Sequence, residues 1–139
     1  MPMARLGSAT LAVLLLSAAA ASAKPATGFP FGTWENEKRS VRIKVAPCGA
    51  NACGKVIWAN AEAKADAAEG GTKQLVGTQL FQNFAKAEGG EWKGKIFVPD
   101  LNGTYDGSAR PDGASRLVAE GCAVGGLVCK KQVWTKKGR

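Results

Sequence analysis

The sequence predicts an all-β fold, a small antiparallel β-barrel of about eight strands. Apolar and polar residues alternate with a period of two along much of the chain after residue 31, which is the pattern of half-buried strands. Turn-forming residues separate these stretches about every 8–12 residues, a spacing typical of β-sandwiches and barrels. About eight such segments follow one another, which is enough to close a small barrel.

The chain begins with a predicted signal peptide, residues 1–23. Arg5 precedes an apolar stretch over 11–16, and Ala21-Ser22-Ala23 is a small-residue cleavage site. The apolar run is too short to span a bilayer comfortably, so we expect cleavage and a mature protein that is not membrane-spanning. Residues 24–31 are expected to be a flexible Pro/Gly segment, and residues 32–139 a single β-barrel domain.

The first strands are predicted over 32–35, 41–45 and 55–58. In 41–45, three β-branched residues share one face and two basic residues share the other. Turn residues fill 47–54, so 41–45 and 55–58 should form a hairpin. The Ala-rich stretch 60–69 has no large apolar stripe, and we expect it to be a surface loop with at most a weak helical turn. The stretch 75–84 fits a strand or a helix, and Gly77 and Thr78 favour the strand.

The second half of the chain predicts two more hairpins. Residues 91–98 alternate, and Asn102-Gly103 is a strong hairpin-turn dipeptide before a strand over 104–110. Pro111, Asp112 and Gly113 form the next turn. Strands over 116–122 and 127–136 then make the last hairpin.

Four cysteines form two close pairs, Cys48/Cys53 and Cys122/Cys129. Four cysteines allow three pairings, and because each close pair flanks a predicted hairpin turn, we expect disulfides within the pairs. A zinc site is disfavoured, because its ligands usually include C-x₂₋₄-C units, often with histidine, and this chain has no histidine. No C-x-x-C redox motif occurs. Export with disulfides predicts a periplasmic or secreted protein.

Charge and composition exclude several function classes. The formal charge of +8 favours attraction to anionic envelope surfaces, but the bases are scattered, so we expect no specific nucleic-acid partner. The carboxylates Asp100, Asp106 and Glu120 are all explained by turns or solvent-facing strand positions. Without a visible set of nucleophile, base and orienting group, we expect no enzyme, no catalytic residue, no cofactor and no metal.

Several short motifs, taken in order, resemble a known family. They are Gly32-Thr33-Trp34, Pro47-Cys48, the run 53–58, the run 92–97 with Pro99 and Tyr105, Gly121-Cys122, and the run 127–134. Together they are similar to the exported bacterial family called domain of unknown function 2147. The resemblance implies a lipocalin-like β-barrel and no established activity. Gly32-x-Trp34 also resembles the opening of lipocalins, which implies that Trp34 closes the barrel and that Lys136 lies over its ring.

Two functions fit these predictions. The first is a non-enzymatic binding module for a small apolar or amphipathic ligand. The alternative is a structural or interaction protein of the cell envelope, with a filled barrel and no ligand. Small interior residues would leave a cavity for the ligand, whereas Ile, Phe and Trp would fill it. The sequence identifies neither the ligand nor the oligomeric state.

Overall fold

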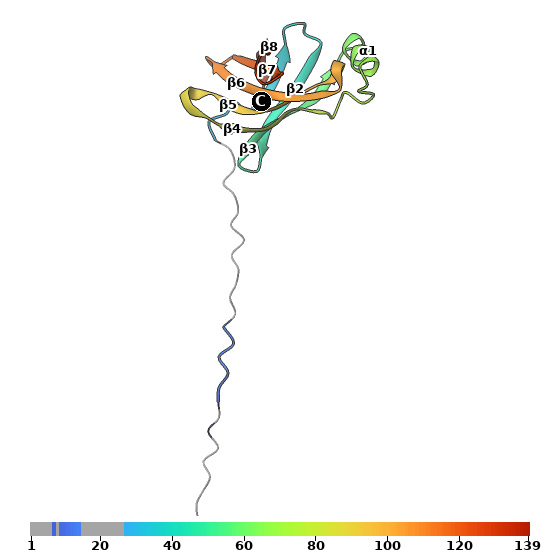
Figure 1. Cartoon of the computed structure of the whole chain (residues 1–139). Coiled ribbons are helices and arrows are strands. Elements are labelled where there is room, and N and C mark those ends of the chain that lie inside the picture. Colours follow the sequence, from blue (N-terminus) through green and yellow to red (C-terminus); the bar gives the residue numbers. More distant parts are fainter. Residues whose placement is uncertain (1–6, 8, 15–26) are drawn as a thin grey trace, which may run out of the picture.

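Eight antiparallel strands close into a barrel, in which each strand pairs with its neighbours in the sequence and the last strand pairs with the first (Figure 1). The computed structural model describes residues 7, 9–14 and 27–139. The predicted cleavage site lies outside these residues. The elements are β1 (Gly32–Asn36), β2 (Val41–Cys48), β3 (Asn51–Ala59), α1 (Ala61–Glu69), β4 (Gln79–Lys86), η1 (Glu88–Gly90), β5 (Trp92–Val98), η2 (Pro99–Leu101), β6 (Gly103–Asp112), β7 (Arg116–Ala123) and β8 (Val128–Gly138).

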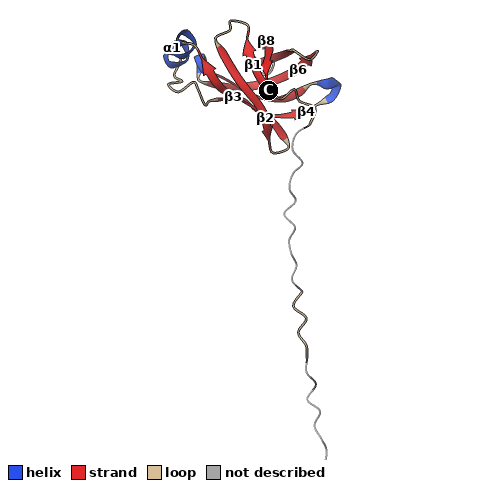
Figure 2. Ribbon diagram, turned by 180° about the vertical axis from the view of Figure 1, so that it is seen from behind, coloured by secondary structure: helices blue, strands red, loops and turns tan. Residues whose placement is uncertain are grey.

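The predicted fold class and the order of the strands are confirmed. Alternation decides which side chains point inward: in β2, Ile43 and Val45 are buried while Arg42 between the apolar positions is exposed. The stretch 75–84, whose pattern fits a strand or a helix, contains the first residues of strand β4, which begins at Gln79. Strands dominate the views in Figures 1 and 2, with α1 at one end of the barrel.

Large side chains fill the barrel interior. The largest fully buried ones are Trp34, Phe81, Phe84, Ile43, Leu117, Val45 and Val56, and Trp92 and Trp134 are nearly as buried. The ring of Phe84 lies against Gly94, where an added Cβ would come within 2.9 Å of Phe84 Cδ2. Ile96 covers Gly107 in the same way, with its Cγ1 2.5 Å from the position of an added Cβ. Gly94 and Gly107 therefore make room for large neighbouring side chains.

The Ala-rich stretch 60–69 forms the helix α1 with its N-cap, so the prediction of a surface loop was wrong. Asn60 caps the helix by accepting a hydrogen bond from the backbone N–H of Ala63 (2.8 Å). The helix packs on the barrel through small side chains: Ala67 is fully buried, and Ala63 packs at the edge of the core. Gly70 allows the backbone to pass close to Asp100 in η2. Alanine therefore serves both as a good helix former and as the contact surface.

Residues 29–31, the last part of the segment 24–31 that we expect to be flexible, pack onto the barrel, and residues 24–26 lie outside the described residues. Phe29 is buried, with its ring centroid 4.9 Å from that of Trp92 in an edge-on arrangement. The Pro30 carbonyl accepts a hydrogen bond from Trp34 Nε1 at 2.9 Å. These contacts cover one end of the barrel.

The β7–β8 hairpin continues past the end of β1. β1 stops at Asn36, which pairs with Trp134, whereas β7 pairs with β8 as far as Val128. Residues 128–132 therefore have β7 on one side and, in the described part of the chain, no strand on the other. We call residues 122–132 the outer hairpin. Among the described residues, no helix is long and apolar enough to cross a membrane.

Candidate functional site

Trp34 lies at the closure between β1 and β8. Its side chain is completely buried, and its indole N–H is satisfied by Pro30. Lys136, its register partner on β8, places Nζ 5.9 Å from the centroid of the Trp34 ring. This distance is at the outer limit for a cation–π contact. The geometry fits a structural closure, and the burial leaves no face of the indole for a ligand.

Glu35, which the sequence analysis did not single out, anchors an ionic cluster on the outer face of the same closure. Its side chain is only 5% exposed. Arg42 Nε donates to its Oε2 at 2.8 Å, and Lys137 Nζ lies 3.5 Å from its Oε1. Arg42 also covers the ring of Trp58, with 4.9 Å from Cζ to the centroid. The hydrogen bond from Arg42, aided by Lys137, holds the pKa of Glu35 below its usual 4.5 despite burial.

A sequence signal for this cluster existed in the strand pattern. Glu35 directly follows Trp34 and therefore points to the opposite face of β1. Arg42 is its cross-strand partner on β2. A carboxylate and a guanidinium opposite each other are a stabilising pair, but the pairing is visible only once the register is known.

Two disulfides close the hairpins that the sequence predicted, Cys48–Cys53 and Cys122–Cys129. Cys53 is buried, and the backbone N–H of Asn83 on β4 donates to its Sγ at 3.5 Å. Cys122 and Cys129 are directly opposite in the β7–β8 register. Because disulfides persist outside the reducing cytosol, both links are typical of a non-cytoplasmic protein.

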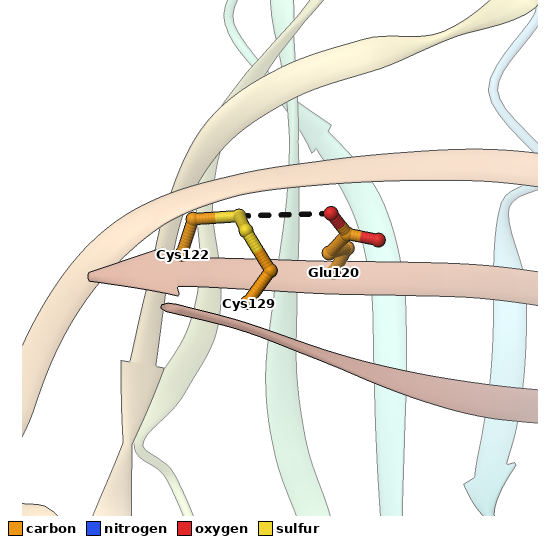
Figure 3. Close-up of side chains that lie close together, drawn as sticks. All are labelled: Glu120, Cys122 and Cys129. Carbon is orange, nitrogen blue, oxygen red and sulfur yellow. Dashed lines mark hydrogen bonds between the residues drawn. A yellow bond between two sulfur atoms is a disulfide. The ribbon is translucent and has the colours of Figure 1, made fainter. Parts of the chain in front are cut away.

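The second disulfide lies beside a carboxylate. Figure 3 shows Glu120 next to the Cys122–Cys129 bridge, with Glu120 Oε1 3.6 Å from Cys122 Sγ. A sulfur in a disulfide has no proton, so we treat this approach as a packing contact. The three side chains could offer ligand atoms to a metal ion only as free thiolates and a carboxylate. With the bridge closed, the cluster has one carboxylate, and Lys131 Nζ already lies 3.7 Å from it.

The other carboxylates that we considered lie apart on the surface. Asp106 on β6 forms an ion pair with Lys95 on the neighbouring strand. Asp100 lies in η2, an exposed turn beside α1. Each thus has a structural explanation, as expected, and whether the chain is an enzyme stays a prediction.

Two hollows in the described part of the chain are shallow and open to solvent. The first, about 290 Å³, lies beside the start of β1 and is mainly apolar, with two bases; its lining is Phe31, Gly32, Lys44, Val45, Ala46, Pro47 and Arg139. The second, about 190 Å³, lies between α1 and the segment before β4; its lining is Lys64, Lys73, Gln74, Leu75 and Val76. Neither reaches into the aromatic interior.

Comparison with known proteins places the chain in a family. The profile of the family described as "Uncharacterized protein conserved in bacteria (DUF2147)" matches residues 32–136, which is the barrel from the start of β1 to Lys136 near the end of β8. No curated protein and no solved structure matches the chain significantly. The chain therefore belongs to the DUF2147 family, as the order of its motifs suggested.

Proposed function

We propose that this DUF2147 protein is a non-enzymatic interaction protein of the cell envelope, exported to the periplasm or secreted, which acts through its outer surface. The observation that carries the proposal is the filled interior. Trp34, Phe81, Phe84 and Trp134 occupy the space where a barrel of this size would hold a small ligand. The two disulfides support a location outside the cytosol and fix the hairpins that the surface presents.

The second candidate is the binding module for a small apolar or amphipathic ligand. Two observations favour it. The Trp134 indole Nε1 is buried and, among the described residues, finds no hydrogen-bond partner, so an acceptor on a small ligand or a water could satisfy it. The hollow beside Phe31 and Pro47 has an apolar lining with Lys44 and Arg139, which suits an amphipathic anion. Its size is at the lower limit for a small-molecule site.

Native mass spectrometry of the protein purified from its own host distinguishes the two candidates. A clean apo protein is expected if the interior is filled by its own side chains. A stoichiometric co-purifying lipid would overturn the proposal in favour of the binding module.

Phe84→Ala provides the positive control. It removes a fully buried ring and opens space in the interior, and apolar cavities of this kind bind small aromatic molecules. The variant should take up benzene, detected by ligand-dependent thermal stabilisation, and the native protein should not. Equal stabilisation of both proteins would show that the native interior already has room for a ligand.

A further inference from the structure

The outer hairpin carries an unusual apolar tip. Val124, Leu127 and Val128 are 70%, 83% and 62% exposed, and Gly125 and Gly126 complete the turn between them. Three exposed apolar side chains thus lie within five residues at the end of one hairpin, and clustered exposed apolar side chains mark contacts with a membrane or a protein.

The turn keeps this apolar tip at a conformational cost. Val124 has φ of +53°, a left-handed conformation that β-branched residues strongly disfavour. Asn or Gly would fit the position without strain. Strain of this kind is concentrated at functional sites, so the valine side chain itself is the feature to explain.

Basic side chains lie between the apolar tip and the closure of the barrel. Lys130 and Lys131 follow the tip on β8. Lys38 and Arg39 belong to the β1–β2 turn, which meets β8 further from the tip, where Glu37 accepts a hydrogen bond from the Val133 backbone N–H at 2.9 Å. Lys131 is paired with Glu120. Among the described residues, Lys38, Arg39 and Lys130 have no ion-pair partner within 4.0 Å. An apolar tip with a cationic base is complementary to the headgroup region of an anionic bilayer.

We propose that the outer hairpin inserts Val124, Leu127 and Val128 into the interface of an anionic lipid bilayer while Lys130 contacts its headgroups, and that Lys38 and Arg39, further from the tip, add electrostatic attraction to the anionic surface. This inference rests on the proposed function, since it names both the part of the outer surface that binds and the lipid bilayer to which it binds. The Cys122–Cys129 disulfide ties the base of the hairpin, so little conformational freedom remains to be lost on insertion.

Co-sedimentation of the oxidised mature protein with lipid vesicles tests the proposal. The vesicles are phosphatidylcholine with or without about 30% phosphatidylglycerol, because each base near an anionic surface contributes about fivefold in affinity. The native protein should bind the anionic vesicles and not the neutral ones. Absence of binding to anionic vesicles would overturn the insertion, whatever other partner the hairpin binds.

Leu127→Ser and Leu101→Ser form a matched pair. Leu101 in η2 is 65% exposed and lies at the same end of the barrel, but next to Asp100 and the acidic helix α1. Leu127→Ser should lower the partition coefficient by about tenfold to a hundredfold, from the loss of one buried leucine. Leu101→Ser should change it by less than about twofold, within the ordinary effect of a surface substitution. Equal losses, or no loss with Leu127→Ser, would overturn insertion by the hairpin.

Val124→Asn separates binding from folding. Asparagine tolerates the left-handed conformation, so this variant should melt at the same or a higher temperature while binding vesicles at least about fivefold more weakly, since it exchanges one buried apolar side chain for a polar one. Retained binding would overturn the role of the valine. Lipid transferred from the vesicles into the supernatant with the native protein would instead contradict the filled barrel, and so the proposed function itself.

Discussion

Strand β8 is packed at one end and exposed at the other, although its pairing with β7 is continuous. Trp134 is buried against Leu117 and Phe81. Gln132, Lys130 and Val128 alternate with it, so they share its face of the strand, and all three are exposed. The difference arises at Asn36, where β1 ends and the neighbouring strand is lost.

The two ends of β8 therefore belong to regions with different roles: the closure stabilises the fold, and the outer hairpin is the proposed binding surface. The closure around Trp34 contains the buried rings and the Glu35 cluster, whereas the outer hairpin contributes exposed side chains and a strained turn. Substitutions in the first region should therefore change the free energy of unfolding, and those in the second should leave it nearly unchanged.

The largest effect is expected from Trp34→Ala. Removing a fully buried tryptophan should lower the free energy of unfolding by about 3–5 kcal/mol. The comparison change Val128→Ala in the outer hairpin should lower it by less than about 0.5 kcal/mol, because the residue is already 62% exposed. Denaturant unfolding followed by circular dichroism measures both, and similar losses would contradict the division between the two regions.

The two disulfides test the same contrast. Each closes a small loop, for which chain entropy predicts about 2–2.5 kcal/mol. Cys48→Ser with Cys53→Ser should cost this amount, because Cys53 is buried against β4. Cys122→Ser with Cys129→Ser should cost less, because a hairpin that lacks a second neighbour can open locally without unfolding the barrel.

Thermal unfolding and hydrogen exchange check this prediction. The Cys122/Cys129 double variant should lose amide protection in residues 122–132 while its melting temperature falls less than that of the other double variant. A larger fall in its melting temperature would show that the outer hairpin is part of the cooperative unit.

Glu35→Gln should cost about 1 kcal/mol at neutral pH, a value reduced because Arg42 is partly exposed. The folded pKa of Glu35 is lowered below its usual 4.5, mainly by the hydrogen bond from Arg42. Its stabilisation is therefore fully present above pH 4.5 and is lost as the pH falls through the folded pKa. The difference between native protein and variant should shrink below pH 4.5 in denaturant titrations. A difference independent of pH would mean that the charge of Glu35 does not stabilise the fold.

The sequence was sufficient for the strands and the disulfides because both depend on local patterns. Alternation predicted the strands around Ile43 and Ile96, and turn residues placed each cysteine pair across a hairpin. The helix α1 was missed because its docking surface consists of alanines, such as Ala67, which carry no apolar stripe in a hydropathy pattern.

The Glu35 cluster and the outer hairpin could not be predicted in the same way. Both depend on the register between β1 and β8, two strands at opposite ends of the sequence. On the face of β8 that buries Trp134, the polar residues Gln132 and Lys130 indicate that packing stops, but they do not show which neighbouring strand is missing there. The strained φ of Val124 is likewise a property of the folded turn.

Of the effects expected at the closure, the smallest is that of Lys136→Ala. Its ammonium lies 5.9 Å from the Trp34 centroid, and an exposed cation–π contact contributes about 0.5–1 kcal/mol. Lys136→Met keeps most of the apolar stem and removes the charge, so it separates ring packing from the cation–π contact. If the charge matters, both variants should lose stability in denaturant unfolding; if only the stem packs on the ring, Lys136→Met should match the native protein.

Lys131→Ala in the outer hairpin is the control, since its exposed ion pair with Glu120 should contribute little. An equal loss for Lys131→Ala would place part of the stability in the outer hairpin and weaken the contrast between the two regions.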